Sequence, residues 1–478
     1  MKLHSPEEKA SAGGVFLIGR QLLGMGLSLV SVIVVTRMLG PQKYGLFAIV
    51  SGIAGYASEV GKLGLDVYLI RHQGNLEQRQ IGVTQTLYLI IGLGISLAIG
   101  IFSPFLAKWY NESNLLYIFQ AYSVIIPITM FAAVPTALLD HRLEFRQVVT
   151  AEFVGQLANV MVAVPLIWQF RSIWGLVAGA LVQSILVLLL TSHWSKMRPS
   201  PCWNWQEAKA QIRYGFGYSA SVWVWQGRNL VNPLLVGKLL GTEAVAYVAM
   251  AMRLTAMLGF AQGAVWRIYM SLLARVAHDR KRMKEAMETG LRFQIMILGV
   301  VFIIFSGVSR ELVTGVMGER WLPVLRIFPF IAAGMIVNSG FSLYSSALYV
   351  IGENREVTLF HIVHLALFAT SAWCIIAIDK DVIGYGWAEI AAFASYYFIR
   401  RALHVRLFAV SERQLYFNIL LVLGSILLLS SISESTLMLR LVVLLCMLCI
   451  LLFAIPQNRE YIILFWGKIG DRLRSDYR

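Results

Sequence analysis

The chain has 478 residues, of which 58% are hydrophobic and only 14% carry a charge, and its formal net charge is +15. Soluble domains contain about 25% charged residues, so this composition excludes an ordinary water-soluble protein. The excess of positive charge does not indicate nucleic-acid binding, because most Lys and Arg residues lie in short segments between apolar blocks. There they orient membrane helices and contact anionic headgroups.

The apolar blocks are roughly 20 residues long, which is the length that a helix needs to cross a bilayer. We therefore predict an all-α integral membrane protein with about fourteen transmembrane helices. In chain order, the predicted spans are 15–36, 44–65, 81–106, 115–138, 148–169, 173–193, 214–237, 244–273, 291–316, 325–350, 357–378, 382–405, 415–432 and 437–455.

Lys and Arg are concentrated in the termini and in the even-numbered loops between these spans. By the positive-inside rule, both termini are predicted to be cytoplasmic. The first fourteen residues are polar and include Glu7 and Glu8, so they do not resemble a cleaved signal peptide.

A short stretch at the end of the first span recurs about two hundred residues later. Residues 35–40 read VTRMLG and residues 236–241 read VGKLLG, and each copy closes an apolar run with a cation and a glycine turn. Duplicated helix bundles are common in transporters. The repeat predicts two six-helix lobes of parallel topology, followed by two extra C-terminal helices. The predicted domains are an N-lobe with its linker (1–206), a C-lobe (207–411), and a last pair of helices with a basic cytoplasmic tail (412–478).

Ionisable side chains inside the spans are costly and usually face a cavity or a partner. Glu59, Lys62 and Asp66 share one helical face. Arg228 and Arg253 lie roughly 14 Å from the outward ends of their spans, near the midplane. We predict a mixed-charge vestibule that faces the cytoplasm, with two arginines deeper in. The predicted substrate-binding residues are Arg20, Glu59, Lys62, Asp66, Trp225, Arg228, Asn232, Arg253 and Arg267.

Several of these residues have structural alternatives that the sequence leaves open. Glu59, Lys62 and Asp66 can neutralise one another, and Arg267 can extend to the headgroups. His361 and His364 fit packed positions better than a proton relay. The polar side chains of the fifth span, Gln156 and Asn159, are predicted to form interhelical hydrogen bonds rather than to bind a ligand. No motif for catalysis or for a metal centre stands out.

One group of motifs carries a family resemblance. Residues 14–17 with Arg20, and residues 36–47 (TRMLGPQKYGLF) with the pattern R-x-L-G-P-x-x-Y-G-x-F, resemble the polysaccharide-export branch of the multidrug/oligosaccharidyl-lipid/polysaccharide (MOP) exporter superfamily. Residues 238–241 and 348–354 are also similar to that branch. The resemblance implies two six-helix lobes with alternating access to a central cavity in the bacterial cytoplasmic (inner) membrane. The cationic lumen of the family carries over only in kind, onto Arg20, Arg228 and Arg253.

The resemblance also implies the cargo, a polyprenyl-pyrophosphate-linked oligosaccharide that is translocated to the outer leaflet as a polysaccharide precursor. Arginines at the midplane would supply always-charged, bidentate partners for the pyrophosphate. An organic-cation antiporter of the same superfamily is the alternative, and its cavity should be dominated by acidic groups. A membrane glycan polymerase or ligase is disfavoured, because each predicted outward loop is too short for an independent fold. We therefore expect a transporter and not an enzyme.

The remaining expectations concern cofactors and partners. No cofactor is expected, and the coupling ion, H⁺ or Na⁺, is left open. The expected partners are the lipid-linked glycan, anionic membrane lipids and the polysaccharide polymerase machinery, and no nucleic acid is expected.

Overall fold

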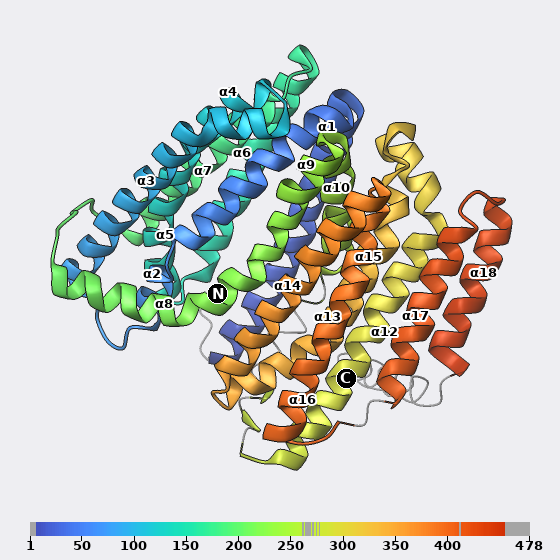
Figure 1. Cartoon of the computed structure of the whole chain (residues 1–478). Helices are drawn as coiled ribbons and strands as arrows, with labels where there is room; N and C mark the ends of the chain where they lie inside the picture. The colour runs from blue at the N-terminus through green and yellow to red at the C-terminus, as the bar shows by residue number, and fades with distance from the viewer. Residues whose placement is uncertain are drawn as a thin grey trace, which may run out of the picture. The chain divides into compact units, whose positions relative to one another are not determined.

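The chain folds into helices throughout the part that the structure describes. The computed structural model describes residues 6–260, 278–410 and 413–454, together with residues 262, 269, 272, 273, 275 and 276. No strand occurs among these residues (Figure 1). The predicted all-α class is therefore confirmed.

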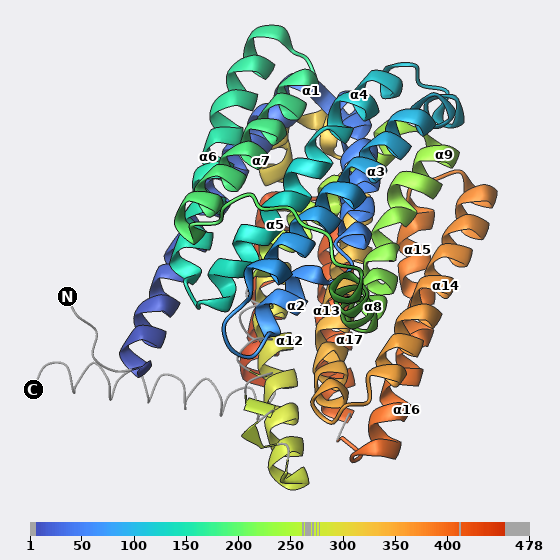
Figure 2. The same ribbon diagram turned by 90° about the vertical axis from the view of Figure 1, so that its left-hand side faces the viewer.

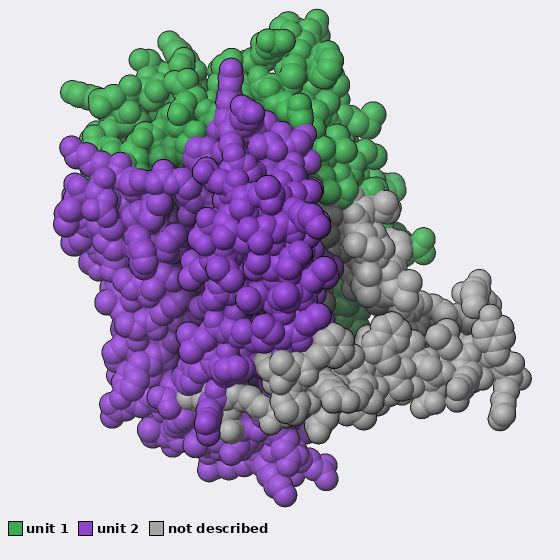
Figure 3. Space-filling model, turned by 90° about the vertical axis from the view of Figure 1, so that its right-hand side faces the viewer, with its two compact units in different colours: residues 1–249 green, residues 250–478 purple. Residues whose placement is uncertain are grey.

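Two compact units make up the chain, residues 1–249 (unit 1) and residues 250–478 (unit 2) (Figure 3). Unit 1 contains α1 (Pro6–Gly61), α2 (Leu65–Arg71), α3 (Gln78–Tyr110), α4 (Asn114–Ser123), α5 (Ile125–His141), α6 (Phe145–Phe170), α7 (Trp174–Ser195), α8 (Trp205–Gly227), the 3-10 turn η1 (Arg228–Leu230), the π-turn η2 (Asn232–Val236), α9 (Gly237–Leu240) and the start of α10 (Thr242–Leu258).

Unit 2 begins within α10. It continues with α12 (Arg280–Leu312), η3 (Val313–Met317), η4 (Glu319–Trp321), α13 (Val324–Val350), α14 (Asn354–Asp379), α15 (Ile383–Ala392), η5 (Phe393–Ser395), α16 (Tyr396–Arg406), α17 (Arg413–Ser431), α18 (Leu437–Cys449) and η6 (Ile450–Ala454). The predicted domains, 1–206, 207–411 and 412–478, are defined by the sequence repeat. The two units are defined by compactness, so they do not test these domains, which stay predictions.

The internal repeat reappears in the backbone of its turns. Gly40, which kinks α1 before Pro41, has φ 72° and ψ 177°. Its counterpart Gly241 has φ 88° and ψ −177°. Later in the two copies, Arg171 ends α6 at φ 47° and ψ 36°, and Lys380 ends α14 at φ 48° and ψ 32°. Because positive φ is rare for residues other than glycine, this agreement supports duplication of the bundle.

Seven helices in the described part of the chain are long and apolar enough to cross a membrane. The count becomes eight if the bent pair 29–61 and 65–71 is one span. The chain is therefore a multi-pass membrane protein, but the predicted number of fourteen is not confirmed. Several predicted spans are interrupted helices: 214–237 crosses η1 and η2, and 382–405 crosses η5.

Small residues bring neighbouring helices of unit 1 close together. In α7, a Cβ on Gly175 would lie 3.0 Å from the carbonyl oxygen of Ala163, and one on Gly179 would lie 2.9 Å from the carbonyl oxygen of Asn159 in α6. The GxxxG pair in the sequence thus serves helix packing. α6 and α7 consequently run side by side along their length (Figures 1 and 2).

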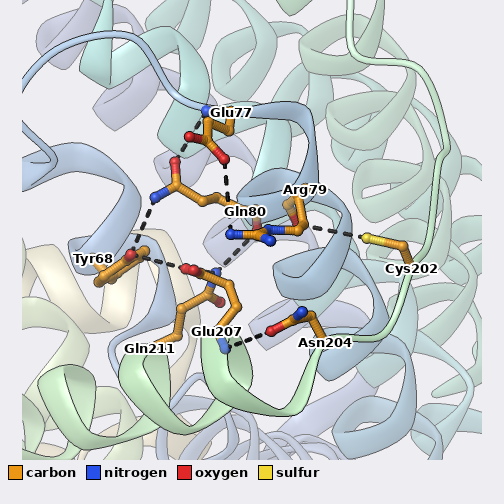
Figure 4. Close-up of polar contacts among 8 residues, drawn as sticks. All are labelled: Tyr68, Glu77, Arg79, Gln80, Cys202, Asn204, Glu207 and Gln211. Atoms are coloured by element: carbon orange, nitrogen blue, oxygen red, sulfur yellow. Dashed lines mark hydrogen bonds and ion pairs between the residues drawn. The ribbon is translucent and has the colours of Figure 1, made fainter.

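Polar side chains fix the start of α8 against α2 and α3 (Figure 4). The Tyr68 hydroxyl donates to Glu207 Oε1 at 2.9 Å, and Gln211 Nε2 donates to the carbonyl of Gln80 at 3.0 Å. Asn204 caps α8 by accepting from the Glu207 backbone N–H at 2.9 Å. Because Gln211 is fully buried, its hydrogen bonds also satisfy polar groups that would otherwise be costly to bury.

Candidate functional site

A cavity of about 330 Å³ lies within unit 1, between α2, α5, α6 and α7. Its polar lining combines charged, hydroxyl and amide side chains: Lys62, Asp66, Thr129, Thr136, Asp140, Glu152, Gln183 and Ser184. Apolar side chains of α2, α5 and α7 complete the wall. We call this space the acidic cavity, because its described lining residues include three carboxylates and one cation.

A sharp break between α1 and α2 brings the first two charged residues to this cavity. Leu63 and Gly64 have φ of 50° and 66°. At Gly64 a Cβ would lie 2.4 Å from Ser219 Oγ, so the close approach of α8 requires glycine there. The break leaves Lys62 in the turn and Asp66 in the first turn of α2, and both line the cavity.

Hydrogen bonds hold the charges at the break in place. Lys62 Nζ lies 2.9 Å from Glu59 Oε2, and both side chains are partly exposed. Asp66 Oδ1 accepts from the backbone N–H of Val67 at 3.0 Å, and the Asp66 N–H donates to the Tyr88 hydroxyl at 3.0 Å. The structure therefore contains the Glu59–Lys62 pair that the spacing allowed, and it places Asp66 at the cavity wall.

The sequence does not single out Asp140, because this residue follows the end of the predicted span 115–138 and belongs to no motif. In the structure α5 extends to His141, so Asp140 stays helical and lines the acidic cavity. Glu152 comes from the polar stripe of α6 that also contains Gln156 and Asn159. Those two amides form the predicted interhelical bonds: Gln156 donates to the Gly24 carbonyl at 3.0 Å, and Asn159 donates to Gln183 Oε1 at 3.1 Å.

The residues predicted from the seventh span lie where regular helix gives way to 3-10 and π geometry. The Arg228 guanidinium lies 4.6 Å from the centre of the Trp225 ring, which is a cation–π contact. Asn232 is buried, and its Nδ2 donates to the Val245 carbonyl at 3.3 Å. Arg228 and Trp225 are thus half-buried and close together, whereas Asn232 ties η2 to α10.

The other predicted arginines lie elsewhere. Arg253 is half-buried on the part of α10 that belongs to unit 2. The backbone of Arg20 is helical within α1, and Arg267 lies outside the described residues. The binding role of all nine predicted residues stays a prediction.

Of the two histidines in the eleventh predicted span, His364 is buried within unit 2. Its Nδ1 lies 2.9 Å from Ser395 Oγ, and the Ser395 hydroxyl lies 2.7 Å from the Ala392 carbonyl. The Ser395 hydroxyl therefore lies within hydrogen-bond distance of both the His364 ring and the Ala392 carbonyl. The rings of Phe360 and Tyr396 flank His364, so it occupies a packed position.

Known proteins share both sequence and fold with this chain. The family model described as polysaccharide biosynthesis protein matches residues 34–326. The succinoglycan biosynthesis transport protein ExoT of Rhizobium meliloti (strain 1021) is 22% identical over 390 residues, which is 77% of each chain.

Two solved transporters have similar folds. The lipid II flippase MurJ in an inward closed conformation has a TM-score of 0.75 at 13% identity, covering 94% of this chain and 100% of its own. An inward-facing multidrug resistance MATE transporter of the MOP superfamily has a TM-score of 0.65 at 14% identity, covering 79% of this chain and 94% of its own. This likeness shows that the chain shares the fold of these two proteins, as the predicted resemblance implied. Because the family match spans more than half of the chain, the chain belongs to the polysaccharide biosynthesis protein family.

Proposed function

We propose that the protein is an alternating-access flippase, which moves a polyprenyl-pyrophosphate-linked oligosaccharide from the cytoplasmic to the outer leaflet of a bacterial inner membrane. The family match over residues 34–326 carries this proposal. The transport role of the ExoT relative and the fold shared with a lipid II flippase support it. Both termini would be cytoplasmic, and polysaccharide polymerase machinery would take up the product.

The sign of their charge suggests that the candidate residues have two different roles. A pyrophosphate is strongly anionic, and the three carboxylates among the described lining residues, set against one lysine, would repel it from the acidic cavity. Arg228 and Arg253 are half-buried and permanently charged, so they are better partners for the cargo head. Carboxylates in a cavity can instead take up a proton or Na⁺. We therefore propose that Asp66, Asp140 and Glu152 serve coupling, and that Arg20, Arg228, Arg253 and Arg267 serve the cargo.

The same acidic cavity favours one other candidate, an organic-cation antiporter. Such a transporter needs negative charge where its substrate binds, and Asp66, Asp140 and Glu152 supply it in unit 1. The two candidates differ in the sign of the cargo, so the substrate itself separates them.

The test uses cells that lack this protein. Loss of a flippase should make lipid-linked glycan accumulate in the inner leaflet and should stop polysaccharide export, and the wild-type gene should restore both. Resistance to organic cations should not change. Normal glycan export together with a loss of organic-cation resistance would overturn the flippase assignment and support the antiporter.

A further inference from the structure

A second cavity of unit 1, of about 380 Å³, lies at the end of α7 and is distinct from the acidic cavity. Its charged lining residues are Arg142, which follows α5, and Lys196 and Arg198, which follow α7. None of the described residues that line it is acidic. Three cations thus share one pocket without a carboxylate in its wall. We call it the basic pocket.

The segment that carries Lys196 and Arg198 is fastened to α3. Gln85 is fully buried, its Nε2 donates to the Arg198 carbonyl at 3.2 Å, and its Oε1 accepts from the Ser200 N–H at 2.9 Å. Gln78 adds a hydrogen bond to Ser200 Oγ at 2.7 Å. One buried side chain therefore holds the backbone on both sides of residue 199.

The next residues of the segment lie equally close to α3. The Cys202 N–H donates to the Gly82 carbonyl at 3.4 Å, and the Cys202 carbonyl accepts from Thr86 Oγ1 at 2.9 Å. Cys202 Sγ also contacts the Arg79 carbonyl at 3.6 Å (Figure 4). A Cβ on Gly82 would lie 2.5 Å from the Ser200 carbonyl oxygen, so only glycine permits this approach. The basic pocket is therefore built into the fold.

The cations of the basic pocket keep N–H donors that are available to a ligand. Arg142 Nη1 donates to the Ser195 carbonyl at 3.0 Å, and a guanidinium has four further N–H donors. Lys196 caps α7 in the left-handed conformation, with φ 54° and ψ 29°. All three cations have exposed side chains. The pocket wall also includes the apolar side chains of Ile81, Leu138 and Met197.

We propose that the basic pocket binds the phosphate group of a membrane lipid. Cations brought together repel one another, and a phosphate relieves that repulsion while accepting several hydrogen bonds. Arg matches phosphate oxygens with its planar fork, and the apolar wall suits the hydrocarbon next to the headgroup. The phosphate can come from an anionic phospholipid or from a polyprenyl phosphate. The proposal does not rest on the flippase function, because binding is measured without transport.

The experiment measures lipid bound to the purified full-length protein by native mass spectrometry. Phosphatidylglycerol and a polyprenyl phosphate are tested separately, and zwitterionic phosphatidylethanolamine serves as the reference lipid. The variant Arg142→Gln with Arg198→Gln removes two cations. Each cation near a phosphate is worth about 1 kcal/mol, so we expect roughly 25-fold weaker binding of the phosphate lipid. The lipid that shows this loss identifies the source of the phosphate.

Three further variants distinguish binding at this pocket from an effect of net charge. Lys209→Gln removes an exposed cation of α8 that does not line the pocket, and it should leave binding unchanged. Gln85→Leu keeps every cation but releases the segment at residues 198–200, so it should weaken binding as well. The variant Arg142→Lys with Arg198→Lys keeps the charge and should retain most of the binding.

Equal melting temperatures in detergent establish that the variants are folded. Wild-type binding of both phosphate lipids by the Arg142→Gln, Arg198→Gln protein would overturn the proposal. An equal loss of binding in Lys209→Gln would also overturn it, since net charge alone would then explain the binding.

Discussion

Glu59 and Lys62 show at the residue scale what sequence spacing can and cannot predict. Their separation of three residues predicted contact on one helical face, and the structure has the ion pair at 2.9 Å. The acidic cavity could not be predicted, because Asp66, Asp140 and Glu152 come from three different helices, α2, α5 and α6. Only tertiary packing brings them to one wall, and Asp140 belongs to no motif of the sequence.

The ion pair leads to a prediction of coupling. Glu59→Gln removes the ion-pair partner of Lys62, and Lys62→Met removes the ion-pair partner of Glu59, so the double change should harm stability or transport less than the sum of the single changes. Because both side chains are partly exposed, we expect a coupling free energy of about 1 kcal/mol or less. A double-mutant cycle of thermal unfolding measures it. Additive effects would mean that the two charges face separate environments.

Arg253 is the residue whose substitution should affect cargo binding most. Arg253→Ala should abolish glycan export at a normal protein level, because it removes a permanent anion partner. Arg253→Lys should be partly active, since an ammonium offers a point charge instead of a fork. Arg401→Ala, at an exposed arginine of α16, is the matched control and should export normally. Wild-type export by Arg253→Ala would remove this residue from the cargo site.

At the scale of elements, apolar block length predicted the helices well and their interruptions poorly. The span 325–350 coincides with α13 (Val324–Val350), because a continuous apolar block admits few alternatives. The breaks at 62–64 and at η1–η2 were missed. They depend on close approaches such as Gly64 to α8, and a single sequence does not show its neighbours.

The C-terminal helices were predicted to be appended to the repeat, and one ion pair fastens α18 to α12. Arg440 is almost fully buried and forms a bidentate contact with Glu311, with Nη1 2.8 Å from Oε2. Arg440→Ala should lower the free energy of unfolding by about 2 kcal/mol, because it removes the charged hydrogen bonds between a buried arginine and Glu311.

Thermal unfolding in detergent checks this prediction. The neighbouring exposed pair Arg310–Glu434, at 3.5 Å, is the control, and Arg310→Ala should change stability by less than about 1 kcal/mol. If both variants unfold at the same temperature as the wild type, the Arg440–Glu311 contact does not hold α18.

On the scale of the whole molecule, the repeat was the most informative feature of the sequence. It predicted paired bundles of parallel topology. The φ and ψ angles of Gly40 and Gly241 agree closely, which supports the duplication. What the repeat could not indicate is the sign of charge inside each part. The predicted vestibule is of mixed charge with two arginines deeper in, and the acidic cavity of unit 1 adds that three carboxylates gather at one wall.

Alternating access predicts how the midplane positions respond to a reagent. Single cysteines at positions 228 and 253, in a cysteine-free background, should react with an impermeant thiol reagent from one side at a time. Without cargo, the cytoplasmic side should dominate. Added cargo should reduce that bias, because a ligand shifts two states only by binding them differently. Simultaneous labelling from both sides would indicate a pore.

The most direct measurement is transport by the purified protein in proteoliposomes. A fluorescent polyprenyl-pyrophosphate oligosaccharide is placed in the vesicles, an H⁺ or Na⁺ gradient is imposed, and an impermeant quencher reports the fraction that reaches the outer leaflet. We predict movement well above that in protein-free vesicles for the wild type and the Arg401→Ala control, and none for Arg253→Ala. A wild-type protein that leaves the glycolipid in place, but exchanges an organic cation for the imposed ion, would contradict the flippase account.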